Sequence, residues 1–177
     1  MAVLALVAPL LGWTGIAATD MTGNQGSDCR KVKGACDLTL RIDAGLRPYT
    51  IGESVPLKAT LINQGKREQA VEERALFRYI NHERLPAREG EFSVGGQVIG
   101  DGPPASTNEA TMAVLAPGAF LSRTVDVAPL LAGVMTEPGT YRIWLEYCYS
   151  GPKTFKGVSA HRGCIRSNEI VLNMVPR

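Results

Sequence analysis

The stretch EPGTYRIWLEYCYS, residues 137–150, decides the fold class of this chain. It opens with a Pro-Gly turn, and apolar and polar side chains then alternate along it. Successive residues of a strand face opposite sides of the sheet, so each parity forms one face. The parity that we expect to be buried holds Tyr141, Ile143, Leu145 and Tyr147. The parity that we expect to face outward holds Arg142, Trp144, Glu146 and Cys148.

Similar alternation recurs on both sides of this strand. It is clearest in residues 37–43, 54–65, 117–131 and 168–174, and one short strand is expected near 92–98. The segment 68–80 fits one or two strands, or a helical turn that begins at RALF. Short alternating runs separated by Gly, Pro and Asn turns favour an all-β sandwich over a fold with crossover helices.

Length and charge exclude some classes of protein. A chain of 177 residues suits one domain and is long enough to bury a core. With 19 basic and 17 acidic residues, the net charge is only +2. Dedicated nucleic-acid binders are far more basic, so we expect no nucleic-acid partner.

The first residues, MAVLALVAPLLGWTGIAA, carry no charge. Pro9, Gly12 and Gly15 interrupt the apolar run, whereas a membrane span needs about 20 apolar residues. The run resembles a signal peptide that ends in small residues at Ala17. We therefore predict a leader at 1–17, with a retained anchor as the alternative. A polar segment at 18–36 and a sandwich domain at 37–177 would follow, in an exported protein of the periplasm or the extracellular space.

Four cysteines fit an exported chain: Cys29, Cys36, Cys148 and Cys164. An even number in an oxidising compartment suggests two disulfides, and four cysteines allow three connectivities. Zinc is the rival interpretation, but the Cys-x-x-Cys pairs of structural zinc sites are absent from the sequence.

The order of these strand patterns resembles a known family. EPGTY is similar to the approach to the tyrosine corner of immunoglobulin-like sandwiches. VPLKATLINQG, LAPGAFLSRTVDVAPLL and EPGTYRIWLEY together resemble the β-sandwich domain that precedes the catalytic domain of secreted deuterolysin-type zinc peptidases. The resemblance covers residues 37–174 and implies an antiparallel, immunoglobulin-like Greek-key sandwich of about seven strands. No His-Glu-x-x-His is present, so it implies the non-catalytic module.

Cys148 departs from the immunoglobulin pattern. The second cysteine of true immunoglobulin domains points inward and bridges the two sheets, whereas Cys148 has the outward parity. We therefore expect Cys148 to pair with Cys164 and close the loop between the last two strands. Cys29 would then pair with Cys36 and close a second, smaller loop.

The sequence gives little support for an enzyme active site. The only histidines, His82 and His161, are interpreted as solvated loop residues, because a catalytic zinc wants three protein ligands. Carboxylates crowd one region, and a glycosidase pair among them is the weaker alternative to a solvated face: Glu72, Glu73, Glu83, Glu89 and Glu91. We predict no enzyme activity, no metal and no cofactor.

Basic residues are distributed unevenly. Residues 29–36 and 149–167 hold bases and no acid, and the turn after the second strand adds two more bases beside Glu68. In immunoglobulin topology these three segments lie at the same end, where binding loops are common. The predicted ligand-binding residues are Arg30, Lys31, Lys33, Lys66, Arg67, Lys153, Lys156, Arg162 and Arg166.

These observations lead to a binding hypothesis with alternatives. The ligand would be an anionic polymer of the cell envelope, or an exported protein partner. The alternative without a function is that these bases only keep the loops soluble. Trp144 is the candidate for a partner contact, against the interpretation that it covers the sheet and stacks on an arginine. The second hypothesis is an inhibitor or chaperone of an exported peptidase, acting through loop shape.

Overall fold

The computed structural model describes residues 37–86, 89–99 and 111–177, and the chain is all-β over these residues, as predicted. The leader, the polar segment, Cys29, Cys36, Arg30, Lys31 and Lys33 lie outside the described residues. The long strands are β1 (Leu38–Ala44), β3 (Pro56–Asn63), β5 (Tyr79–Arg84), β6 (Val94–Ile99), β8 (Phe120–Asp126), β9 (Gly139–Tyr149) and β13 (Ile170–Val175). The short ones are β2 (Tyr49–Thr50), β4 (Gln69–Glu72), β7 (Met112–Leu115), β10 (Thr154–Phe155), β11 (Val158–Ser159) and β12 (Gly163–Arg166).

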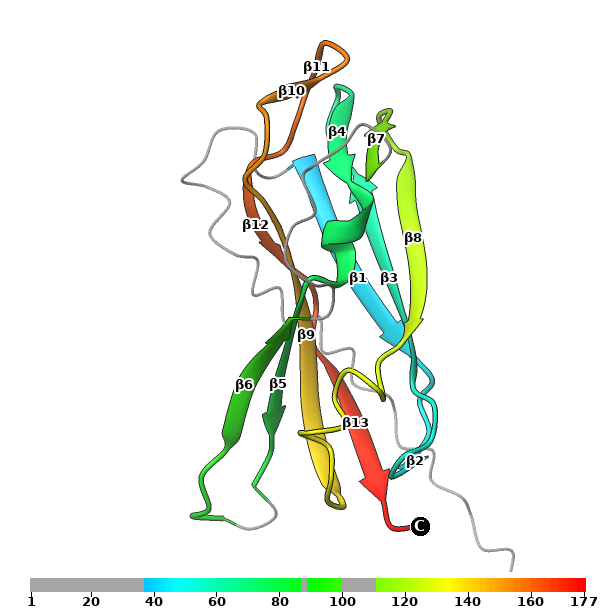
Figure 1. Cartoon of the computed structure of the whole chain (residues 1–177), viewed down its shortest axis with the longest axis vertical. Coiled ribbons are helices and arrows are strands. Elements are labelled where there is room, and N and C mark those ends of the chain that lie inside the picture. The colour runs from blue at the N-terminus through cyan, green and yellow to red at the C-terminus, as the bar shows by residue number, and fades with distance from the viewer. Residues whose placement is uncertain (1–36, 87–88, 100–110) are drawn as a thin grey trace, which may run out of the picture.

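Two main sheets lie against each other (Figure 1). One has the order β1-β3-β8, and the other has the order β2-β13-β9-β5-β6 with β12 paired to β9. Neighbouring strands are antiparallel except β2 and β13, which are parallel. Two small ribbons, β4–β7 and β10–β11, stand at the upper end of Figure 1, and the C-terminus lies at the lower end.

Strand β9 confirms the alternation predicted for residues 137–150. Its burial alternates from residue to residue, and every member of the inward set is at most 1% exposed. The outward set is half-buried. The inward face meets Leu40, Leu57 and Leu61 of the opposite sheet in one apolar core. Burying each such side chain stabilises the fold by about 1.5–3 kcal/mol, which makes β9 the principal strand of the core.

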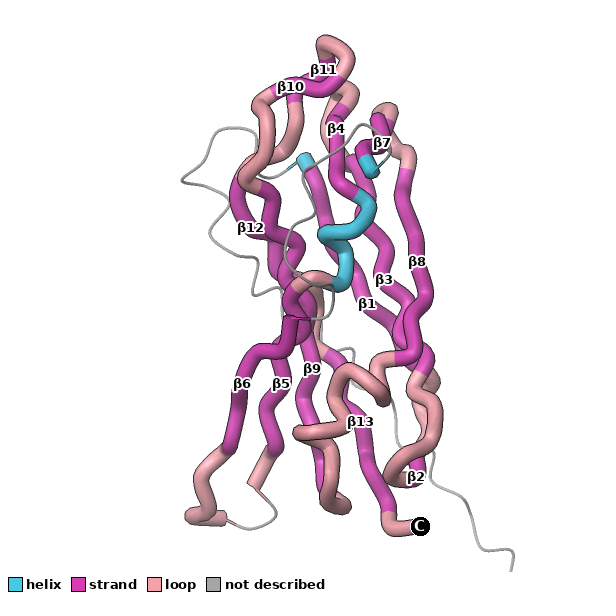
Figure 2. Tube along the Cα trace, in the orientation of Figure 1, coloured by secondary structure: helices cyan, strands magenta, loops and turns pink. Residues whose placement is uncertain are grey.

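The segment 68–80 forms a strand, a helical turn and a second strand. Between β4 and β5 the chain adopts a 3-10 helix, η3 (Glu73–Phe77), coloured as helix in Figure 2. Its last three residues, Ala75, Leu76 and Phe77, are all buried. These three side chains join the core, and the 3-10 turn interrupts the strand alternation between β4 and β5.

The outer edge of β1 is closed by a side chain. Asn168, between β12 and β13, accepts a hydrogen bond from the backbone N–H of Ile42 at 2.8 Å. Its Nδ2 donates to the carbonyl of the same residue at 3.0 Å. The amide thus takes the place of a paired residue and links the two sheets. It also satisfies backbone groups that an open sheet edge would leave available for aggregation.

Cysteine pairing agrees with the predicted topology where it is described. Cys148 of β9 and Cys164 of β12 lie directly opposite in the ladder and form a disulfide. The bond closes the loop between β9 and β12 within one sheet. The Cys29–Cys36 disulfide stays a prediction. Among the residues described, no helix has the length and apolar character of a membrane span.

We expect Asn168→Ala to lower the free energy of unfolding by about 1–2 kcal/mol, because it leaves both backbone groups of Ile42 without this partner. Urea denaturation followed by tryptophan fluorescence measures the change. Asn173→Ala is the control, since Asn173 is an exposed residue of β13. Equal stability of the two variants would contradict the role of the Asn168 amide.

Candidate functional site

Five of the predicted binding residues gather at one end of the molecule, which we call the basic end: Lys66, Arg67, Lys153, Lys156 and Arg162. They come from the turn between β3 and β4 and from the connection between β9 and β12, which lie together at the top of Figure 1. The start of β1 is held there too, because Gln64 and Gly65 both donate backbone hydrogen bonds to the Asp37 carbonyl, at 2.6 and 3.1 Å.

Asn63 organises the turn that carries Lys66 and Arg67. Its side chain is fully buried, and Nδ2 donates to the carbonyls of Arg67 and Leu115, each at 2.8 Å. Its Oδ1 accepts from the Gly65 N–H at 3.0 Å. A Cβ on Gly65 would lie 2.6 Å from Cγ of Asp37, so glycine is needed there. The sequence NQG predicts a turn. It does not predict that the buried Asn63 side chain donates to the carbonyls of Arg67 and Leu115.

The hairpin β10–β11 presents Lys156 at its tip. Lys156 and the following Gly157 both have positive φ, 50° and 78°. Positive φ at both central residues is the pattern of a type I′ turn, which matches the twist of a two-residue hairpin. Lysine is uncommon in this conformation. Its ammonium lies 5.2 Å from the centre of the Phe155 ring.

The hairpin rests on β4. Ala160 and Ala70 form a parallel bridge, and the His161 N–H donates to the Ala70 carbonyl at 3.3 Å. The Ala160 N–H turns back to the Lys153 carbonyl at 2.8 Å. These contacts place Lys153, Lys156 and Arg162 beside the β3–β4 turn, although the two segments are far apart in the sequence.

The electrostatics of the basic end follow from its exposed side chains. All five bases are exposed, and none takes part in an ion pair in the described part of the chain. Among the described residues, the acids nearby are Glu68, which is exposed, Asp37, which is half-buried, and Glu72, which is buried and paired with Arg78. The exposed bases outnumber these acids and leave a positive end, in a protein whose net charge is only +2.

Arg166 lies apart from the basic end. It is on β12, opposite Glu146, where it bonds to Glu169 at 2.6 Å. Its guanidinium carbon lies 4.4 Å from the centre of the Trp144 ring. Trp144 is half-buried and covered by this arginine, which agrees with the interpretation that it covers the sheet. A partner contact at Trp144 stays a prediction.

Interpreting both histidines as solvated loop residues was wrong. His82 lies on β5 and His161 follows β11, and they are only 8% and 5% exposed. His82 has the inward parity, and Gly96 opposite it leaves room for the ring, since a Cβ there would lie 3.0 Å from Nε2. Burial lowers the pKa of both imidazoles, because the charged form loses its hydration.

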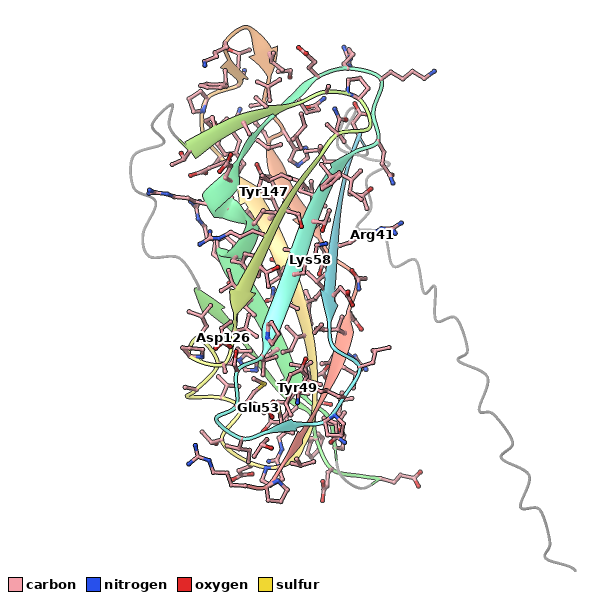
Figure 3. The ribbon with its side chains drawn as sticks, turned by 90° about the vertical axis from the view of Figure 1, so that its right-hand side faces the viewer. Arg41, Tyr49, Glu53, Lys58, Asp126 and Tyr147 are labelled. Carbon is pink, nitrogen blue, oxygen red and sulfur yellow. A yellow bond between two sulfur atoms is a disulfide. The ribbon has the colours of Figure 1, made fainter. Side chains whose placement is uncertain are left out.

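Glu72 also corrects an expectation. It was assigned to a solvated carboxylate cluster, but it is only 3% exposed, whereas Glu73, Glu89 and Glu91 are exposed and Glu83 is half-buried. The Glu72 N–H donates to Oη of Tyr147 at 2.9 Å, and Arg78 approaches its carboxylate at 3.5 Å. Burial raises the pKa of the Tyr147 phenol, because the charged form would lose its hydration. Figure 3 labels Tyr147 in the upper half of the molecule.

Two other kinds of candidate site, a metal centre and a surface hollow, are less well supported than the basic end. Within residues 37–86, 89–99 and 111–177, no three His, Cys, Asp or Glu side chains are grouped as a metal site would require. An open hollow of about 430 Å³ at the opposite end is lined by Ile51, Gly52, Pro138, Pro176 and Arg177. None of the predicted site residues lines it.

Comparison of the chain with models of known protein families and with curated proteins gives no match.

We expect Asn63→Ala to lower the free energy of unfolding by about 2–3 kcal/mol, because three hydrogen bonds of a buried amide are lost together. Urea denaturation measures the loss. Gln64→Ala is the matched control, since its exposed side chain makes a single hydrogen bond within the described residues, to Thr39. If the two variants lose the same stability, Asn63 does not organise the turn.

Proposed function

We propose that this chain is a non-enzymatic, exported binding domain that holds anionic polymers of the cell envelope at its basic end. The observation that carries the proposal is the group of five exposed bases that have no ion-pair partner in the described residues. Unpaired surface cations attract polyanions over roughly the Debye length, about 10 Å at 0.1 M salt.

The arrangement of these bases favours a polymer over a small ligand. They come from two separate loops, and Lys156 is at the tip of a projecting hairpin (Figure 1). Each base would therefore meet a different charged group along an extended chain. Binding of this kind depends on the number of contacts and falls steeply as salt rises.

The proposed domain type is an immunoglobulin-like Greek-key sandwich, related to the non-catalytic domain of deuterolysin-type peptidases. Its support is the tyrosine corner: Oη of Tyr141 donates to the Glu137 carbonyl at 2.9 Å, four residues upstream. The Cys148–Cys164 disulfide supports export, because disulfides persist in oxidising compartments. That disulfide joins two strands of one sheet, in contrast to the bridge between sheets in antibody domains.

The alternative function is an inhibitor or chaperone of an exported peptidase. The shape of the hairpin favours it, since a two-residue turn at Lys156 and Gly157 on a disulfide-closed loop is narrow and projects from the body. Such a protein would bind one partner stoichiometrically and would depend on loop shape more than on charge.

The test measures binding of the full chain to polyphosphate and to polygalacturonate between 50 and 300 mM salt. The variant carries Lys153→Glu, Lys156→Glu and Arg162→Glu. We expect steep salt dependence for the unmodified chain and a loss of at least about tenfold in affinity for the variant. Using two polymers separates phosphate from carboxylate as the preferred group.

A matched control reverses three exposed bases elsewhere: Arg41→Glu, Lys58→Glu and Arg74→Glu. Arg41 and Lys58 lie on the three-stranded sheet and are labelled in Figure 3, and Arg74 is on η3. The control has the same net charge as the variant, so it should bind well if position matters. Equal binding by the two proteins would sink the proposal. Salt-independent, stoichiometric inhibition of a peptidase would favour the alternative.

A further inference from the structure

The basic hairpin, residues 151–162, is attached to the body at two places. The disulfide and the β9–β12 ladder hold its base, where Gly163 pairs with Tyr149. Farther out, Ala160 and His161 dock it on β4 through the bridge to Ala70 and the 3.3 Å hydrogen bond from His161. Three bases of the basic end are on this hairpin, so its docking decides where they lie.

The side chain of His161 is the buried part of this docking. It is 5% exposed, and its ring centre lies 6.2 Å from that of Tyr147 on β9. Its Nε2 atom is buried and has no hydrogen-bond partner among the residues that the structure describes. A neutral imidazole tolerates this environment, because the tautomer protonated at Nδ1 leaves Nε2 without a proton.

The charged imidazole does not fit the same place. An imidazolium carries an N–H at both nitrogens, so protonation would bury a donor at Nε2 with no acceptor. It would also take a positive charge out of water. The docked hairpin therefore accepts only the neutral form of His161, and burial lowers the pKa of this imidazole accordingly.

Neighbouring groups do not compensate the charge. Tyr147 and Tyr149, from β9, carry phenols that are neutral at acidic and neutral pH, and burial raises their pKa further. Glu72, from β4, is engaged by Arg78, which follows η3. Arg162, next in the chain, is itself a cation. Together these groups present no free anion to Nε2.

We propose that protonation of His161 releases the basic hairpin from β4, so that acidification opens the basic end. This regulation rests on the proposed function, since it matters only where the hairpin binds a ligand. The stability of docking is complete above the pKa of a free imidazole, about 6.5, and is lost progressively as the pH falls below it. The disulfide keeps the base of the hairpin in place, so the change is local.

Hydrogen exchange of the full chain at pH 7.5 and 5.0, corrected for intrinsic rates, tests the release. We expect protection of the His161 N–H, which donates to the Ala70 carbonyl on β4, to fall at least about fivefold at pH 5.0, while β9 keeps its protection. A fivefold change corresponds to about 1 kcal/mol, the smallest cost of burying an unpaired N–H. His161→Phe keeps a ring against Tyr147 and cannot be protonated, so its hairpin should stay protected at both pH values. His161→Gln provides a second uncharged variant if the phenylalanine packs poorly.

His82→Gln is the matched control, because His82 is the other buried histidine and lies on β5. It should lose hairpin protection at pH 5.0 as the unmodified chain does. Constant protection across pH, an equal loss in both His161 variants, or a loss shared by β9 would each overturn the proposal. The exchange experiment contains no polymer, so failure of polymer binding and failure of hairpin release are observed separately.

Discussion

Burial of one face of β9 is the constraint on which the rest of the structure depends. Four inward side chains, from Tyr141 to Tyr147, are at most 1% exposed and meet the opposite sheet. Strands β5, β12 and β13 all pair with β9, so its position fixes the larger sheet. Because side chains alternate along a strand, a shift of one residue would turn the apolar face toward water and the charged face into the core.

Two tyrosines of this apolar face, Tyr141 and Tyr147, also make specific hydrogen bonds. A phenol that is buried must find a polar partner, and both hydroxyls find backbone groups of another segment. Oη of Tyr141 bonds to the turn before β9, and Oη of Tyr147 accepts from the N–H of Glu72 on β4. One end of β9 is thereby tied to its own turn, and the other end is tied to the ribbon that supports the basic hairpin. The core and the candidate site are joined through Tyr147.

The sequence predicts the parts of the fold in which local pattern and tertiary burial agree. Strands β1, β3 and β9 alternate clearly, and the outward parity of Cys148 argues against a bridge between the sheets and favours Cys164, the partner that the structure shows. The predictions for His82, His161 and Glu72 are wrong because polar side chains were expected to be solvated, whereas packing against strands distant in the sequence buries them. The sequence predicts a turn after β3 but not the burial of Asn63, because one of the two carbonyls that bind its side chain belongs to Leu115, far away in the sequence. The five bases of the basic end lie together because of the strand topology. Arg166 lies apart from them, where it contacts Trp144 and Glu169.

The place of the disulfide has a consequence for how this protein could change. Cys148 and Cys164 face each other in a regular ladder, so the bond and the flanking pairs fix the spacing of the two loop ends independently of what lies between them. Closing a longer loop costs little additional entropy, since the cost grows only with the logarithm of its length. The part of this segment beyond the contacts that Ala160 and His161 make with β4 and β9 is therefore exchangeable. Its length and chemistry can vary, or be replaced by a grafted peptide, while the sheet beneath it keeps its register.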